Sequence, residues 1–303
     1  MNVPESVEIT EVGPRDGFQN IEEWIPTETK IDLIGRLIHC GFKKIEVTAF
    51  VHPKAVPQMA DAKEIVRSVK ASHPDVEISA LVPNIRGVTD ALEAGADTVN
   101  YIISASERHN FENTRQPIER SLENLAEVCR MKGNRKICLA IPTAFVCPWT
   151  GLVPFANVEN IIARGLEYGV DDVGIADTLG SANPALVYTT VSRLRTRFPD
   201  REMAMHFHDT RGMGLANVIA AMQAGATRFE SAIGGLGGCP FAPGAAGNIA
   251  TEDLVNMLEE MGVTTGIDLA SVMATVFRAK EVLPVPINSN MIMAITCEMK
   301  TAE

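Results

Sequence analysis

Two histidines spaced one residue apart, His206 and His208, lie at the end of the apolar run 203–207. If this run is a β-strand, its side chains alternate between the two faces, so both imidazoles point to one side and Phe207 points to the other. Two imidazoles on one side of a strand end are typical of a metal site. A lone histidine would more often pack in a core, but the paired spacing favours metal binding.

Two oxygen-bearing residues elsewhere in the chain could complete such a site. Asp16 follows Arg15 just after the first apolar run, although an isolated Arg-Asp pair is more often a surface ion pair or a turn. Asn248 precedes a helical pattern, where it either caps the helix or offers its carbonyl oxygen to a cation. Two nitrogens and two oxygens suit Mg²⁺ or Mn²⁺, with Zn²⁺ less favoured. The single negative ligand leaves positive charge that, with Arg15, would stabilise an alkoxide or enolate oxygen.

Two further carboxylates end or interrupt apolar runs. Glu46 lies within the run 44–49. A buried carboxylate needs a partner, and Arg15 is the candidate. The pair would be either a structural ion pair inside the barrel or part of the catalytic site. Asp177 follows the run 172–176 and either caps the next turn or accepts a hydrogen bond at the site.

A cysteine, Cys239, lies at the centre of a segment rich in glycine, residues 234–247. Such a segment forms no stable element and suits a mobile loop that closes over a site. A thiol in that loop beside a cation could act as an acid or a base, whereas most cysteines are buried as small apolar residues.

The residues above must be positioned by regular elements, and the chain alternates short apolar runs with helical patterns throughout. The expected strands are 7–12, 44–49, 77–82, 98–103, 137–142, 172–176, 203–207 and 229–233, and the expected helices are 27–41, 57–72, 86–95, 117–132, 157–169, 184–198, 213–225 and 249–262. Glycines end four of these helices, as C-caps do: Gly41, Gly95, Gly169 and Gly225. Eight consecutive β–α units favour a TIM (β/α)₈ barrel over an open doubly wound sheet. Its active site would lie at the C-terminal ends of the strands.

Residues 1–303 are expected to form one domain, with the barrel at about 7–262 and a C-terminal extension, 263–303, that contains a further helix. The net charge of −11 argues against a nucleic-acid partner. The six cysteines are scattered, which indicates reduced thiols in a cytoplasmic protein. The N-terminus does not resemble a signal peptide, and no apolar window is long enough to span a membrane.

The chain closely resembles the 3-hydroxy-3-methylglutaryl-CoA lyase family, a group of metal-dependent lyase and aldolase barrels related to isopropylmalate synthase. The resemblance covers nearly the whole chain. It is carried by EVGPRDGFQN (11–20), IEVTAFVHPKAVPQM (45–59), HFHDTRGMGLAN (206–217) and SAIGGLGGCPFAPGAAGNIATEDLV (231–255). The last motif is the most specific, because it separates the lyases from the synthase branch.

The resemblance implies a lyase of an acyl-CoA thioester that cleaves 3-hydroxy-3-methylglutaryl-CoA to acetyl-CoA and acetoacetate, in leucine degradation and ketone body formation, and it suggests a homo-oligomer. In the implied retro-Claisen reaction a base removes the hydroxyl proton, the hydroxyl carbon becomes a ketone, and acetyl-CoA leaves as its enolate. The implied metal ligands are Asp16, His206, His208 and Asn248. The implied catalytic residues are Arg15 at the enolate oxygen, Cys239 as the proton donor, Glu46 and Asp177 as proton-transfer or supporting groups, and His206.

Some segments near the expected mouth depart from the family pattern. Phe18 replaces a usual leucine, Val146–Gly151 replaces a Gly-Cys-Pro-Tyr-Glu-Gly segment, and Arg211 and Met213 stand where tyrosine and glutamine are common. These departures keep open a related substrate, such as citramalyl-CoA or a longer 3-hydroxy-3-methylacyl-CoA.

Two other classes of protein also remain open. Two histidines and one carboxylate form the site of non-haem iron oxygenases, which usually have a different β fold. A non-catalytic CoA-binding relative is the second alternative, but it would be expected to lack Asp16, Cys239 or Asn248. Zinc hydrolases on barrels also use paired histidines, typically on the first strand rather than the seventh.

Overall fold

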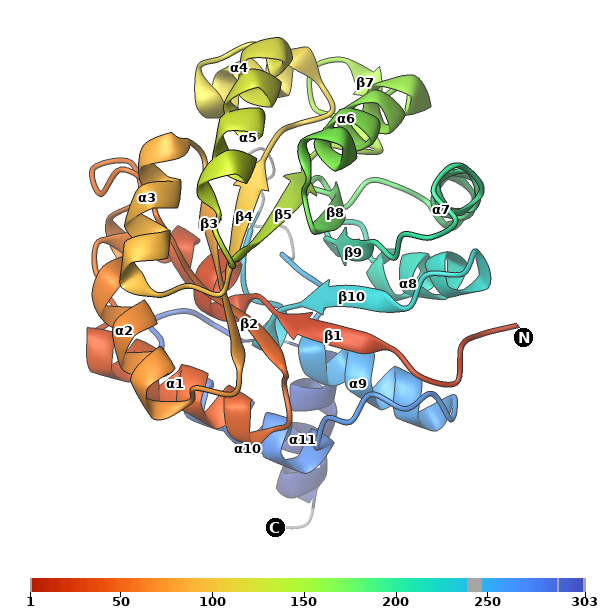
Figure 1. The fold of residues 1–303 in the computed structure, drawn as a ribbon. Coiled ribbons are helices and arrows are strands. Elements are labelled where there is room, and N and C mark those ends of the chain that lie inside the picture. Colours follow the sequence, from red (N-terminus) through yellow and green to blue (C-terminus); the bar gives the residue numbers. More distant parts are fainter. Residues whose placement is uncertain (1, 239–246, 288, 302–303) are drawn as a thin grey trace.

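The computed structural model describes residues 2–238, 247–287 and 289–301. Parallel strands close into a barrel in the order β1-β10-β9-β8-β5-β4-β3-β2 (Figure 1). The strands are β1 Glu8–Glu11, β2 Lys44–Ala49, β3 Glu77–Val82, β4 Thr98–Ile102, β5 Lys136–Ile141, β8 Asp172–Asp177, β9 Ala204–Phe207 and β10 Arg228–Ser231. The predicted (β/α)₈ barrel is therefore confirmed, and the open doubly wound sheet is wrong because β1 pairs with both β2 and β10.

Helices surround the barrel and connect successive strands (Figure 1). They are α1 Thr27–His39, α2 Ala62–Ser72, α3 Ile85–Ala94, α5 Ile118–Met131, α6 Phe155–Tyr168, α7 Pro184–Arg197, α8 Gly214–Gln223 and α9 Thr251–Glu260. Their ends follow local chemistry: the side chain of Asn84 accepts a hydrogen bond from the Gly87 amide at the start of α3. Gly95 ends α3 at φ 103°, a backbone conformation that favours glycine. Among the described helices, none combines the length and the apolar character needed to cross a membrane.

The C-terminal extension contains two helices, α10 Leu269–Val282 and α11 Asn290–Thr301, where one was expected. Two prolines, Pro284 and Pro286, separate them, because proline cannot continue a helix. The Asp253 carboxylate on α9 accepts hydrogen bonds from the Asn290 amide at 3.0 Å and the Met291 amide at 2.8 Å. These bonds hold the start of α11 against the barrel.

Several short elements lie at the C-terminal ends of the strands and were not anticipated. They are the π-helical turn η1 Gly13–Gly17, the 3₁₀ turns η2 Phe18–Asn20, η3 Pro57–Met59 and η4 Ile233–Gly235, the helix α4 Glu107–Thr114, and the hairpin of β6 Val146–Cys147 with β7 Gly151–Leu152. They form the rim around the mouth of the barrel.

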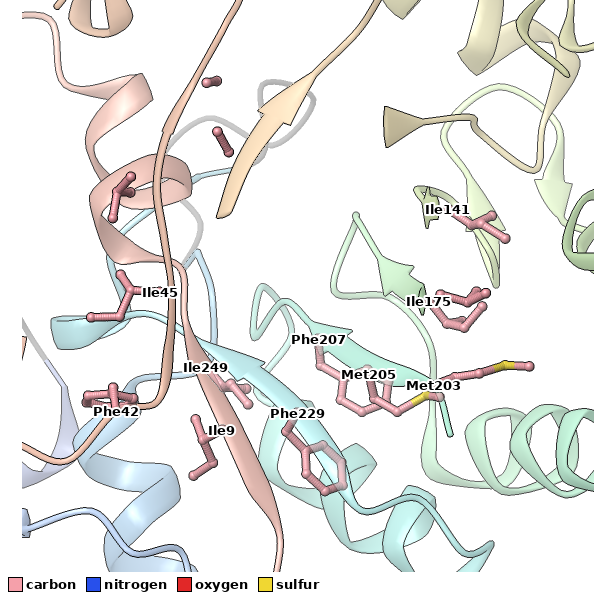
Figure 2. Packing of buried hydrophobic residues seen from close by; sticks show 14 of the residues in the cluster. Ile9, Phe42, Ile45, Ile141, Ile175, Met203, Met205, Phe207, Phe229 and Ile249 are labelled. Carbon is pink, nitrogen blue, oxygen red and sulfur yellow. The ribbon is translucent and has the colours of Figure 1, made fainter. Parts of the chain in front are cut away.

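The apolar core lies between the strands and the surrounding helices. Figure 2 shows Met205 and Phe207 on β9 and Phe229 on β10 within this packed layer. Because side chains alternate along a strand, the residue between Met205 and Phe207, His206, points into the barrel instead. At the N-terminal ends of the strands, Arg228 donates to both carboxylate oxygens of Asp172 at 2.7 Å. This ion pair lies at the N-terminal end of the barrel, and the candidate site lies at the opposite, C-terminal end.

Candidate functional site

Asp16, His206 and His208 meet at the C-terminal ends of the strands. Each offers one ligand atom to a group in which all the ligand atoms lie within 4.8 Å of one another. The ring centres of the two histidines are 5.1 Å apart, and His208 Nε2 lies 3.6 Å from Asp16 Oδ2. All three side chains are buried. The geometry thus brings together three of the four predicted metal ligands as a compact, water-poor cluster.

Asp16 is held in place by the π-helical turn η1 and by hydrogen bonds to both carboxylate oxygens. Oδ1 accepts from Arg15 and from Gln19 Nε2 at 2.8 Å, and Oδ2 accepts from Asn248 Nδ2 at 2.6 Å. Gly13 begins the turn, and a Cβ there would lie 2.6 Å from Glu11 Oε1. This close approach of the Glu11 side chain favours glycine where the chain turns after β1 and brings Asp16 to the site.

Asn248 is the fourth predicted ligand, and the structure places it in the same cluster. Its backbone forms an isolated antiparallel bridge with His208. It does not cap α9, whose N-cap residue is Ala250. Asn248 Oδ1 is buried and has no hydrogen-bond partner among the described residues, and the same holds for His208 Nδ1. A buried acceptor without a donor, such as Asn248 Oδ1, is what a cation would satisfy.

Charged groups in and around the cluster shift the pKa values of Asp16 and His206. Burial opposes the charge of Asp16, but Arg15 and the two histidines overcome it and hold the pKa of Asp16 well below its usual range. Burial also opposes the charge of His206, yet the hydrogen bond with Glu230 raises the pKa of His206. Asp16 is therefore an ionised carboxylate that can bind a cation without first losing a proton.

Arg15 links this cluster to Glu46, as expected from the sequence. The Arg15 guanidinium donates to Glu46 Oε2 as well as to Asp16, and Asn100 Nδ2 donates to Glu46 Oε1 at 2.5 Å. Burial raises the pKa of Glu46 despite the opposing charge of Arg15. Asn100 Oδ1 is itself buried without a partner in the described part of the chain. Arg15 is thus fixed by two carboxylates beside the candidate metal ligands.

Asp177 lies at the end of β8, but its carboxylate turns to the backbone. Oδ2 accepts from the Ala182 amide at 2.9 Å and Oδ1 accepts from the Ser181 amide at 3.2 Å. Burial raises the pKa of Asp177 against these bonds. The structure therefore gives Asp177 the turn-capping contacts, and its proton-transfer role stays a prediction.

Cys239 lies outside the described residues, but the residues that flank 239–246 are described. Gly237 has φ 111°, and a Cβ on it would lie 2.6 Å from Asn248 Nδ2 and 3.4 Å from Asp16 Oδ2. Glycine at this position lets the backbone pass directly over the cluster. The start of the segment that carries Cys239 is therefore beside the candidate metal ligands.

A cavity of about 420 Å³ opens next to the cluster. Asn20, Asn248 and Asp253 contribute polar groups to its wall, and Ile21, Val285 and Pro286 contribute apolar ones. No lysine or arginine is present among its described lining residues. With the carboxylates of Asp209 and Asp253 and no cation among these residues, the wall suits a part of a ligand that carries no negative charge.

Two glutamates at the site were not anticipated, Glu11, which is buried, and Glu230, which is partly buried. Glu230 on β10 accepts a hydrogen bond from His206 Nδ1 at 2.9 Å. Glu11, at the end of β1, accepts from the Gly13 amide at 2.8 Å, the Ile233 amide at 3.0 Å and Thr251 Oγ1 at 2.6 Å. The reasoning applied to Glu46, that a carboxylate inside an apolar run needs a partner, also applies to these positions.

Glu11 is expected to make the stability of the fold depend on pH. Burial raises the pKa of Glu11 to about 8, against the opposing hydrogen bonds. The folded state therefore holds its proton at pH values where the unfolded chain has lost it, so the free energy of unfolding falls as the pH rises from about 4.5 to about 8 and then levels off. The expected loss between pH 6 and pH 9 is about 2–3 kcal/mol. Urea unfolding across this range measures it.

The Glu11→Gln variant removes the titrating carboxylate but keeps an oxygen that accepts from the Gly13 and Ile233 amides. Its free energy of unfolding should therefore lack the pH-dependent loss that Glu11 causes. Glu77→Gln is the matched control. Burial opposes the charge of Glu77, but Lys44 and Lys136 lower its pKa to about 2, so Glu77 does not titrate in this range. An equal pH slope in Glu11→Gln and the wild-type chain would refute the prediction.

Comparison with known proteins supplies the family. The HMGL-like family model matches residues 6–277. A hydroxymethylglutaryl-CoA lyase of Bacillus subtilis is 42% identical over 291 residues, which cover 95% of this chain and 97% of that protein. The crystal structure of the Bacillus subtilis HMG-CoA lyase matches with a TM-score of 0.94 at 41% identity, over 98% of this chain and 100% of that one.

A second solved relative is an HMG-CoA lyase of Acinetobacter baumannii in complex with coenzyme A and 3-methylmalate. It matches with a TM-score of 0.91 at 40% identity, over 96% of this chain and 95% of that one. The resemblance found in the sequence motifs therefore extends to the complete barrel. With a family model that spans most of its length and relatives of this identity, the chain belongs to the HMGL-like family.

Proposed function

We propose that this protein is a divalent-metal-dependent carbon–carbon lyase that cleaves 3-hydroxy-3-methylglutaryl-CoA to acetyl-CoA and acetoacetate. The observation that carries the proposal is the buried cluster of Asp16, His206 and His208, completed by the unpartnered Asn248 Oδ1 and flanked by Arg15. The relatives are hydroxymethylglutaryl-CoA lyases at 37–42% identity, which supports the same reaction.

The residues fit a divalent metal ion, which we assign to Asp16, His206, His208 and Asn248. One carboxylate, two imidazoles and an amide oxygen suit Mg²⁺ or Mn²⁺ better than Zn²⁺. A bound ion would supply a Lewis acid that stabilises negative charge on oxygen. The Asp16 carboxylate is ionised and buried, so it can bind the ion without first losing a proton.

Arg15 is the group we assign to the developing enolate. Its guanidinium is fixed by Asp16 and Glu46, so it is oriented before substrate binds. In the proposed reaction the bond between the thioester α-carbon and the hydroxyl carbon breaks, and its electron pair forms the enolate of acetyl-CoA. A fixed donor at the enolate oxygen lowers the barrier because it needs no reorganisation.

Two proton transfers complete the reaction. The hydroxyl proton of the substrate leaves to a base as the hydroxyl carbon becomes the ketone of acetoacetate, and we propose Asp177 as that base, with Glu46 in support. Asp177 and Glu46 have pKa values raised by burial, which favours proton acceptance. The enolate carbon then takes a proton from the thiol of Cys239, carried by the loop that begins beside Gly237.

The cavity of about 420 Å³ is the proposed site for the neutral arm of an acyl-CoA thioester. It adjoins Asn248, so a thioester held there would reach the metal ligands. The relative from Acinetobacter baumannii was solved with coenzyme A, which supports an acyl-CoA partner for this chain.

A related substrate is favoured by one part of the rim. The hairpin of β6 and β7 carries an exposed Trp149 whose ring centre lies 5.9 Å from that of His109. Trp149 belongs to the segment 146–151, which departs from the family pattern, so the acyl group is the part of the substrate most open to change. Citramalyl-CoA and longer 3-hydroxy-3-methylacyl-CoA thioesters are the alternatives.

A coupled assay of acetyl-CoA release, with Mg²⁺ or Mn²⁺, tests the proposed function. The expected result is release from 3-hydroxy-3-methylglutaryl-CoA. Release only from citramalyl-CoA or a longer analogue would keep the chemistry and reassign the acyl group. Absence of release from all of them would refute the proposed cleavage, and metal-dependent O₂ uptake would instead indicate an oxygenase.

The Cys239→Ala variant should bind metal normally and lose most of its turnover, by about 10²–10⁴-fold, because general acid catalysis contributes on that order. Metal affinity by titration and kcat by the same assay measure the two effects. Cys297→Ala, at an exposed position on α11, is the control. Unchanged kcat in Cys239→Ala would remove the thiol from the mechanism.

A further inference from the structure

His206 is engaged on both sides of its ring. Its Nδ1 lies 2.9 Å from Glu230 Oε2, and a ring nitrogen joins the cluster with Asp16 and His208. A carboxylate can only accept a hydrogen bond, so Nδ1 must carry the hydrogen. The nitrogen that remains for a cation is then Nε2.

The fold itself enforces this contact. Glu230 on β10 is the register partner of His206 on β9 in the parallel sheet. Register partners on neighbouring strands project to the same face, so both side chains point into the barrel at the same level. The contact therefore depends on two rigid strands and not on a loop.

From this geometry we infer that Glu230 is a positioning residue that fixes the tautomer and the ring orientation of His206, so that Nε2 faces Asp16 and His208. This inference rests on the metal site of the proposed function. A carboxylate behind a metal-binding histidine holds the ring and increases its affinity for the ion. Neither the sequence pattern nor the function of the relatives assigns a role to Glu230.

A different role for Glu230 must be separated from this one. Glu230 also interacts electrostatically with Arg15 and Lys44, so it could serve only to balance positive charge inside the barrel. The two roles make different demands on the side chain. Charge balance needs the negative charge, whereas positioning needs an acceptor for Nδ1–H.

Two substitutions of Glu230 distinguish positioning of His206 from charge balance. Glu230→Gln loses the charge but keeps a carbonyl oxygen that accepts from Nδ1–H, and Glu230→Ala loses both. Mn²⁺ binding is measured by electron paramagnetic resonance titration of free Mn²⁺, which does not depend on turnover. We expect Glu230→Ala to weaken Mn²⁺ binding by about 10–100-fold and Glu230→Gln to stay within about 5-fold of the wild-type chain.

Equal losses in the two variants would overturn the positioning role in favour of charge balance, and unchanged binding in Glu230→Ala would overturn it outright. Glu77→Gln is the matched control, because Glu77 is a carboxylate in the barrel that pairs with Lys44 at the opposite end. Thermal unfolding without metal shows whether each variant is folded.

A second measurement uses the wild-type chain alone and stands even if Glu230→Ala does not fold. A long-range ¹H–¹⁵N correlation spectrum of the metal-free protein, labelled at its six histidines, reports which ring nitrogen carries the hydrogen. His206 is assigned by comparison with His206→Gln. We expect hydrogen on Nδ1 of His206, and hydrogen on Nε2 alone would overturn the inference.

The outcomes also separate this inference from the proposed function. A wild-type chain that binds no Mn²⁺ would refute the metal site and the role of Glu230 together. Normal Mn²⁺ binding with lyase activity in the wild-type chain, but no loss in Glu230→Ala, would refute the role of Glu230 alone.

Discussion

The His208→Ala variant is expected to lose Mn²⁺ or Mg²⁺ binding almost completely. His208 contributes one of two imidazoles to a cluster with a single carboxylate, so the remaining groups cannot surround an ion. Loss of a partner behind a metal ligand costs about 10–100-fold in affinity, and loss of the ligand itself should exceed that range. Equilibrium dialysis followed by elemental analysis measures the bound metal per chain.

A histidine far from the mouth provides the control for this experiment. His39 is exposed at the C-terminal end of α1, and His39→Ala should bind metal as the wild-type chain does. Thermal unfolding in chelator should show that His208→Ala is folded. Full metal occupancy in His208→Ala would contradict the proposed ligand set.

The Arg15→Lys variant is expected to lower kcat by about 100-fold or more while Mn²⁺ affinity changes little. Lysine keeps the positive charge between Asp16 and Glu46 but loses the planar, rigid fork of donors. Removal of one donor to a developing oxyanion costs about 10²–10³-fold in kcat. Because the interaction strengthens only as charge develops, kcat should fall far more than KM rises.

Arg228→Lys is the matched control, because Arg228 also lies inside the barrel but pairs with Asp172 at the opposite end. It should leave kcat near the wild-type value. The proposed role of Arg15 would be wrong if Arg15→Lys retained kcat, or if it lost Mn²⁺ binding in parallel with turnover.

Local patterns in the chain were sufficient to predict the barrel. The expected strand 44–49 and the observed β2 coincide, and the other strands differ by at most two residues at each end. Gly41, Gly95, Gly169 and Gly225 all have positive φ, as predicted for helix C-caps. Buried parallel strands are uniformly apolar and each helix has one apolar stripe, so these signals survive without knowledge of the tertiary structure.

The paired histidines were also predictable, because strand alternation places His206 and His208 on one face whatever surrounds them. The partner of His206 was not anticipated. Glu230 is 24 residues away along the chain, and only the register of β10 against β9 brings it opposite the imidazole. The same limit applies to Asn100 on β4, which reaches Glu46 on β2 past the intervening strand β3.

The sequence by itself determined the order of strands and helices, the residue types of the site and the side of each strand on which they lie. The tertiary structure alone decided that Asn248 turns towards Asp16 instead of capping α9, and that Asp177 binds the backbone of its own turn. Strand periodicity is a local property of the backbone, whereas these contacts depend on barrel closure. Closure fixes which distant side chains share one buried space, and each polar atom there must find a partner.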